Sequence, residues 1–264
     1  MNGKVGKSDH QVIEIVPIKR NIIDLRIIGE TPMFLNTLAQ KAQHELLCPA
    51  GRKTASDKKL HMKHDPLVEY YDSARHLKEG PTEIGFPIIG IKSAMCTAAI
   101  ETAGATKTGA QRLIFMPGNY VSVYGIPKLD MRIVRMADIS RTPDVRTRAV
   151  LDKWCLAVRI HYVIPQLTAR SVTNLLCNAG VLIGIGDFRQ DKGKGSYGCF
   201  RVIGDNDKDK EWDDLVKRGG REAQRKAFDN PQPYNAETEE LLEYYFAMKL
   251  KREDPEEAAQ KKAA

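Results

Sequence analysis

The alternation of apolar and polar side chains marks two segments as the clearest strands of the sequence. Residues 22–29 read IIDLRIIG, and residues 154–164 read WCLAVRIHYVI. Because successive side chains of a strand point to opposite faces, the second segment has one strongly apolar face. That face carries Leu156, Val158, Ile160, Tyr162 and Ile164. Weaker strand patterns cover residues 11–18, 120–123, 131–136 and 199–203.

Apolar residues that recur every three or four positions predict helices. The patterns cover residues 35–46, 91–103 and 168–179, with a shorter helix at 108–115 and a short helix or strand at 67–77. Gly104 and Gly180 directly follow two of these helices. Glycine is common just beyond a helix end, so we expect both helices to stop there.

The order of these elements predicts the fold class. Without its insertions the chain reads β-α-β-β-α-β, which is the ferredoxin-like (RRM-like) arrangement of an α+β protein. We expect a core over residues 1–204, with a basic insertion at residues 48–66. A charged helical extension and tail over residues 205–264 would follow, with helices at 209–228 and 236–252.

Composition excludes several classes of protein. Apolar residues make up 42% and charged residues 28% of the chain, so a mainly disordered protein is excluded. No apolar run approaches the roughly 20 residues that span a bilayer, and residues 1–10 lack a signal-peptide core. We therefore expect a cytoplasmic protein without membrane contact. The five cysteines form no C-x-x-C pair, and we expect neither a metal nor a cofactor.

Charge is distributed unevenly along the chain. The formal net charge is +7, but the first 203 residues carry 29 basic and 18 acidic side chains. The remaining 61 residues carry 12 basic and 16 acidic side chains. A basic body suits a polyanionic partner, most simply a nucleic acid.

The glycine-rich segment at residues 184–198, GIGDFRQDKGKGSYG, is the most informative motif. Glycines allow close backbone approach, so backbone N–H groups can line a phosphate-binding concavity. Basic side chains add charge and aromatic rings can stack on bases. The candidates here are Phe188, Arg189, Lys192, Lys194, Tyr197 and Arg201. A flexible loop with solvated lysines is the alternative interpretation.

A glycine-rich basic loop between the second helix and the last strand of a ferredoxin-like fold resembles the RAMP superfamily. These are RNA-binding subunits of CRISPR effector complexes, and the likeness is greatest to the backbone subunits that coat guide RNA. Residues 29–35 (GETPMFL), 86–87 and 92–95 add a likeness to a group of uncharacterised phage proteins. The resemblance spans about residues 20–204. It implies that Lys92 begins a helix facing the RNA.

The basic insertion supplies further candidates. The resemblance implies that it is a mobile finger or thumb, and its charge suits a polyanion. The residues expected to contact nucleic acid are Arg52, Lys53, Lys58 and Lys59.

The leading hypothesis is a non-enzymatic protein that binds RNA or single-stranded DNA and assembles along the strand as a homo-oligomer or filament, alone or with other complex subunits. One alternative is a phage recombination or single-strand-annealing protein that binds DNA. Another is an interaction protein that mimics or blocks a host complex. A metal-independent ribonuclease using His161 is a further alternative.

Overall fold

The centre of the molecule is an antiparallel sheet whose strand order is β10–β1–β9–β6. The computed structural model describes residues 17–37, 64–135, 142–192, 195–205 and 207–253. The four central strands are β1 (Lys19–Gly29), β6 (Tyr120–Tyr124), β9 (Cys155–Ile164) and β10 (Phe200–Gly204). Shorter strands extend the sheet: β4 (Ile84–Pro87), β3 (Arg75–His76) and β5 (Ile114–Phe115), which pairs with β9.

Two helices connect these strands in the ferredoxin-like order. Helix α4 (Ile88–Glu101) lies between β1 and β6, and α6 (Ala169–Leu182) lies between β9 and β10. The sequence β1-α4-β6-β9-α6-β10 with this strand order is the predicted β-α-β-β-α-β arrangement. The predicted fold class, an α+β protein with a ferredoxin-like core, is therefore confirmed.

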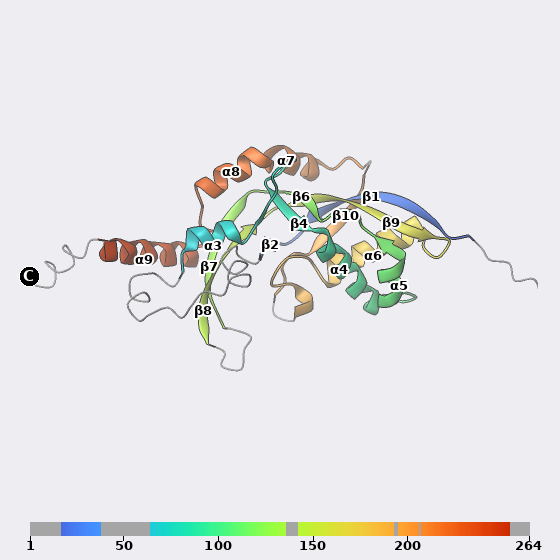
Figure 1. Cartoon of the computed structure of the whole chain (residues 1–264), viewed down its shortest axis with the longest axis horizontal. Helices are drawn as coiled ribbons and strands as arrows, with labels where there is room; N and C mark the ends of the chain where they lie inside the picture. The colour runs from blue at the N-terminus through green and yellow to red at the C-terminus, as the bar shows by residue number, and fades with distance from the viewer. Residues whose placement is uncertain (1–16, 38–63, 136–141, 193–194, 206, 254–264) are drawn as a thin grey trace, which may run out of the picture.

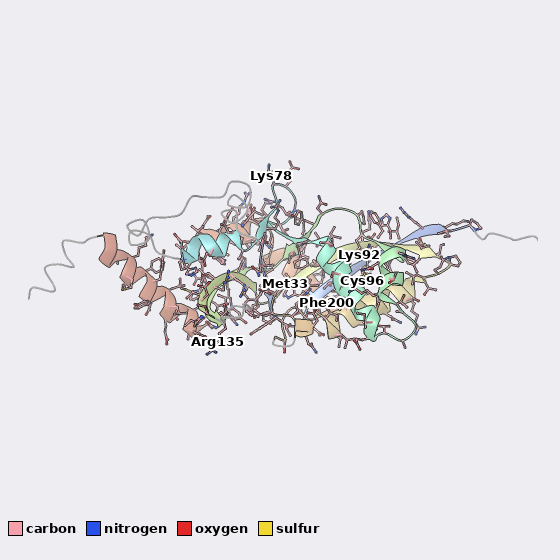
Figure 2. All side chains as sticks on the ribbon, turned by 60° about the horizontal axis from the view of Figure 1, so that its bottom comes forward. Met33, Lys78, Lys92, Cys96, Arg135 and Phe200 are labelled. Carbon is pink, nitrogen blue, oxygen red and sulfur yellow. The ribbon has the colours of Figure 1, made fainter. Side chains whose placement is uncertain are left out.

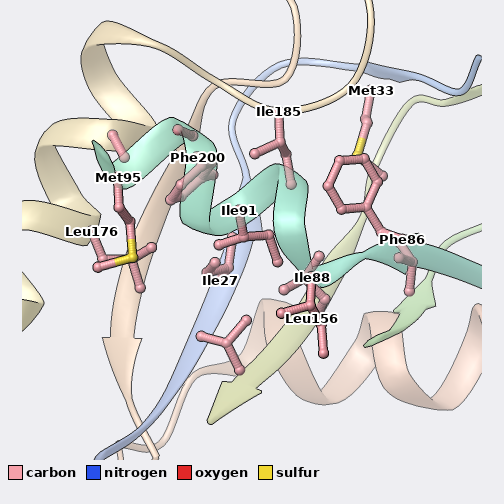
Figure 3. Close-up of a cluster of buried hydrophobic side chains, with 14 of the residues drawn as sticks. Ile27, Met33, Phe86, Ile88, Ile91, Met95, Leu156, Leu176, Ile185 and Phe200 are labelled. Atoms are coloured by element: carbon pink, nitrogen blue, oxygen red, sulfur yellow. The ribbon is translucent and has the colours of Figure 1, made fainter. Parts of the chain in front are cut away.

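Helices cover both faces of the sheet. Figure 1 shows α4, α6 and the short α5 (Lys107–Leu113) on one face and α7 (Lys210–Arg218) and α8 (Arg221–Asp229) on the other. The apolar face of β9 predicted from alternation is buried except at its end, where Ile164 is half-buried, whereas Arg159 on the other face is exposed. Ile88, Ile91 and Met95 of α4 gather with side chains of β1, β9, β10 and α6 in this core (Figure 3).

A second sheet projects from the central one. The hairpin of β7 (Pro127–Arg135) and β8 (Pro143–Leu151) pairs along its whole length, and β2 (Met33–Phe34) adds to β8. Helices α3 (Pro66–Asp72) and α9 (Ala236–Glu253) lie beside this hairpin (Figure 1). The buried Thr238 hydroxyl at the start of α9 accepts from Met131 N at 3.1 Å.

The C-terminal helices are attached to the core through buried contacts. Trp212 of α7 (Lys210–Arg218) packs on Ile28 and Cys155. Gln224 of α8 (Arg221–Asp229) is fully buried. Its Oε1 accepts from the backbone N–H groups of Glu83 and Ile84, and its Nε2 donates to the carbonyls of Val123, Gly125 and Gly219.

Two expectations about helix ends were wrong, both because of glycine. Gly180 does not end α6 but lies inside it, and a Cβ there would meet the backbone and ring of Phe200. The glycine lets α6 approach β10. Residues 209–228 were expected to form one helix but form two, α7 and α8, because Gly219 and Gly220 interrupt the helix. A Cβ on Gly219 would meet the backbone of Gly125.

Two other predicted elements, at residues 35–46 and 67–77, differ from the structure or lie partly outside its described residues. Residues 35–37 are not helical, and residues 38–46 of the first predicted helix lie outside the described part of the chain. Helix α4 therefore takes the place of the first core helix. Residues 67–77 contain both a helix, α3, and a strand, β3. In the described ranges, no helix has the length and apolar character needed to cross a membrane.

Candidate nucleic-acid interface

The glycine-rich segment folds back on the protein's own backbone. It connects α6 to β10 and contains the short 3-10 helix η1 (Gln190–Lys192). Gly186 has a φ of +91° and Gly198 a φ of +73°, the left-handed region that favours glycine. Asp187 N donates to Phe34 O at 2.9 Å, and Gly198 N donates to Pro32 O at 2.9 Å. At these positions the glycines allow two backbone segments of the protein to approach closely. They do not leave a row of unpaired N–H groups that could hold a phosphate.

The two aromatic candidates of this segment pack against other protein side chains. The Phe188 ring meets the Phe34 ring edge-on at 5.5 Å, and the Tyr197 ring meets Phe34 at 4.6 Å. The guanidinium of Arg148 lies 4.6 Å from the Phe188 ring centroid, and that of Arg132 lies 5.6 Å away. The sequence predicted these rings as base-stacking residues, and that role stays a prediction.

Arginines of the β7–β8 hairpin fix this segment in place. Arg148 pairs with Asp187 at 3.0 Å, and Arg132 pairs with the buried Asp130. Burial lowers the pKa of Arg148, with Asp187 opposing that shift, whereas the hydrogen bond to Asp130 raises the pKa of Arg132. The sequence shows five arginines between positions 132 and 148 but does not show that two of them reach Phe188.

A hollow of about 260 Å³ lies between the glycine-rich segment and the first turn of α4. Arg189 lines it together with Gly186 and Asp187 on one side, and Phe86 and Gly90 line the other. Arg189 also pairs with Asp191 at 3.3 Å. The hollow therefore has a basic and an acidic side chain, Arg189 and Asp187, on the glycine-rich side and the N-terminus of a helix opposite.

A second hollow of about 400 Å³ lies on the other side of the same helical turn. Lys92 lines it, with Ile89 of α4 and with Phe115 and Tyr120 from the sheet. Pro87 borders both hollows, so they adjoin at the N-terminus of α4. Figure 2 shows Lys92 on α4, whereas Arg135 lies at the outer end of the hairpin.

The first turn of α4 has no negative charge of its own. Among the described residues no side chain caps its N-terminus, and the first turn contains no acidic residue. A helix N-terminus carries a partial positive charge that favours anions. Together with Arg189 and Lys92, this turn forms the surface that we name the α4 trough: the two hollows and the helical turn between them.

Other predicted contact residues lie elsewhere. Arg201 lies under the start of α7, where it pairs with Asp209 at 2.9 Å and Glu211 at 3.0 Å. The backbone of Lys192 ends η1, and Lys194 lies outside the described residues. The four candidates of the insertion also lie outside the described residues: Arg52, Lys53, Lys58 and Lys59.

A third hollow, of about 490 Å³, lies beside α7 and is lined by side chains of both signs. Lys128, Lys210 and Arg218 face it together with the acidic residues Asp152 and Asp214. Three acidic side chains line this hollow, Glu211 among them, whereas the trough has one, Asp187, so this hollow favours a polyanion less.

Comparison with known proteins gives little guidance. No family model matches the chain, and it matches none of the curated proteins. Among solved structures it is similar to a chain in the cryo-EM structure of a type III-B Cmr-beta complex bound to cognate target RNA, with a TM-score of 0.36 and 13% identity. The match covers 70% of this chain and 59% of that one. The strand order β10–β1–β9–β6 by itself defines the ferredoxin-like core.

Proposed function

We propose that this protein is a non-enzymatic RNA-binding protein whose α4 trough holds the backbone of a single strand. The observation that carries the proposal is the juxtaposition of Arg189 and Lys92 on either side of a helical turn without acidic residues. Phosphates are attracted both by such a turn and by the two cations. Binding through the backbone gives affinity with weak sequence preference.

The position of the trough within the fold also supports this function. It lies between the first core helix and the loop that precedes the last core strand, the loop that carries the resemblance to the RAMP superfamily. In this proposal the protein is a RAMP-like backbone subunit, and copies assemble side by side along the strand. Each copy contacts a few nucleotides, so neighbouring copies together supply the affinity for a long strand.

The test of the trough is a charge-matched pair of double variants. The variant K92A/R189A removes the two cations of the trough, and K217A/R218A removes two exposed cations of α7. Fluorescence anisotropy with single-stranded RNA at low salt should show roughly tenfold weaker binding for the first variant, about 1.4 kcal/mol. Its salt dependence should fall by about 0.7 per lost phosphate contact. The α7 variant should lose no more than about threefold in affinity, the general effect of two fewer positive charges.

Equal affinity of both variants, with unchanged circular dichroism, would reject the trough. Single-stranded DNA of the same sequence tests the preference for RNA.

Intact RNA after prolonged incubation is expected of a non-enzymatic protein, and cleavage that is lost in His161→Ala would overturn that part of the proposal. Light scattering with RNA of increasing length tests assembly, because the number of bound copies should rise with strand length.

A further inference from the structure

The second hollow of the trough has a feature that binding of phosphates alone does not need: two exposed aromatic side chains. Phe115 is 49% exposed and Tyr120 is 39% exposed, although both belong to strands of the central sheet. Ile89, on the facing turn of α4, is 75% exposed. These three residues line one hollow with Lys92. The result is an apolar, aromatic surface beside a cation.

Further cations accompany each ring. The guanidinium of Arg75 lies 5.0 Å from the Tyr120 ring centroid, and that of Arg20 lies 5.8 Å from the Phe115 ring centroid. The Phe115 ring also meets the His161 ring edge-on at 5.8 Å. An acidic or purely apolar partner does not match this mixture. A ligand that is flat, aromatic and attached to a negative charge does match it.

We propose that the hollow lined by Phe115, Tyr120 and Lys92 binds an unpaired nucleobase of the RNA strand, which stacks on an aromatic ring while its phosphate faces the cations. This rests on the proposed function, because the base belongs to the strand whose backbone lies along α4. Pro87 borders both hollows, so a strand can continue from the Arg189 side into the aromatic side.

The volume agrees with this occupant. About 400 Å³ lies in the range of pockets that hold small organic molecules and accommodates one nucleoside. Stacking on an aromatic ring is tolerant of base identity, because every base has a π-face. The site therefore adds affinity for unpaired RNA without adding strong sequence preference. A duplex, whose bases are already stacked and paired, gains nothing from it.

The experiment compares RNA with and without bases. The probe is a single-stranded oligouridine of about 12 nucleotides, within the site sizes of single-strand-binding folds, and the competitor is the same strand with abasic residues. The variants are Phe115→Leu and Tyr120→Leu, which keep an apolar side chain but remove the ring. Tyr244→Leu is the matched control, because Tyr244 is an aromatic residue of α9 that is 67% exposed.

Wild type and Tyr244→Leu should bind the intact strand about tenfold more tightly than the abasic strand. In the double variant F115L/Y120L that ratio should fall to about one, while affinity for the abasic strand stays unchanged. A ratio that stays at the wild-type value in F115L/Y120L would overturn the base site. So would equal binding of both strands by the wild type.

Failure of the base site is distinguishable from failure of the proposed function. If the wild type binds the RNA and loses affinity in K92A/R189A, but F115L/Y120L changes nothing, the trough stands and the base site is rejected. If the wild type does not bind single-stranded RNA at low salt, both proposals are rejected. Quenching of 2-aminopurine in the strand by wild type, but not by F115L/Y120L, is the expected spectroscopic sign of stacking.

Discussion

The two faces of the central sheet differ in how far acidic side chains cover their basic residues. On the α7 side Arg26 pairs with Asp205 at 3.2 Å, and Arg201 pairs with two acids of the α7 N-terminus. On the α4 side Lys92 and Arg189 line open hollows beside a helical turn without acids, and Arg189 has an acidic partner, Asp191, at 3.3 Å. Helices α7 and α8 of the C-terminal extension thus lie over one face, and net charge alone does not locate the surface that suits a polyanion.

The largest expected effect tests how firmly the extension is attached. Gln224→Ala removes the side chain that satisfies the backbone N–H groups of Glu83 and Ile84. Buried donors without partners are costly, so the free energy of unfolding should fall by about 3 kcal/mol. Urea denaturation measures it. Glu222→Ala, at an exposed position of the same helix, should change it by less than about 0.5 kcal/mol.

The second prediction concerns the ion pair of Arg148, which is largely buried, with Asp187, which lines the first hollow of the trough. Asp187→Asn leaves Arg148 without its 3.0 Å ion pair, and the free energy of unfolding should fall by about 2 kcal/mol. The double variant R148M/D187N should be more stable than D187N alone, because no buried charge remains unpaired. Asp214→Asn, whose pair with Arg218 is exposed, is the control and should have little effect. Equal stability of D187N and the wild type would show that this pair does not hold the glycine-rich segment.

The third prediction concerns a variant that makes the two faces of the sheet more alike in charge. The variant D209N/E211Q removes the two acidic charges that pair with Arg201, and the asparagine side chain introduced by D209N can still cap α7. RNA affinity at low salt should rise roughly threefold, less than about 1 kcal/mol, as the α7 face becomes more basic. The variant D213N/E222Q makes the same change of net charge at exposed positions away from Arg201. An equal rise in both would assign the effect to net charge alone.

The smallest expected effect is a change in the pKa of Asp209. The hydrogen bond from Arg201 holds the pKa of Asp209 below its ordinary value. Its contribution to stability is therefore fully present above the ordinary pKa of aspartate and is lost as the pH falls through the lowered pKa. Carbon-detected NMR should show the pKa of Asp209 rising toward the ordinary value in Arg201→Ala. An unchanged pKa in that variant would mean that the ion pair does not persist in solution.

The sequence by itself determined the elements that depend on local periodicity. The alternation in residues 154–164 predicts which face of β9 is buried, and the helical pattern at residues 168–179 predicts most of α6. The element order predicts the ferredoxin-like topology, since few arrangements place such elements in one sheet. These features depend on neighbours in the chain, so they can be read without the folded structure.

Only the tertiary structure decided which charges and glycines are available to a ligand. Arg189 and Arg201 look alike in sequence, and both pair with acids. Arg189 pairs with Asp191 and still lines a hollow, whereas Arg201 pairs with two acids at the start of a helix that follows. Gly198 looks like a phosphate-loop glycine, but its N–H donates to Pro32. The partner of each side chain lies far away along the chain, and electrostatic pairing and backbone packing act through space rather than along the sequence.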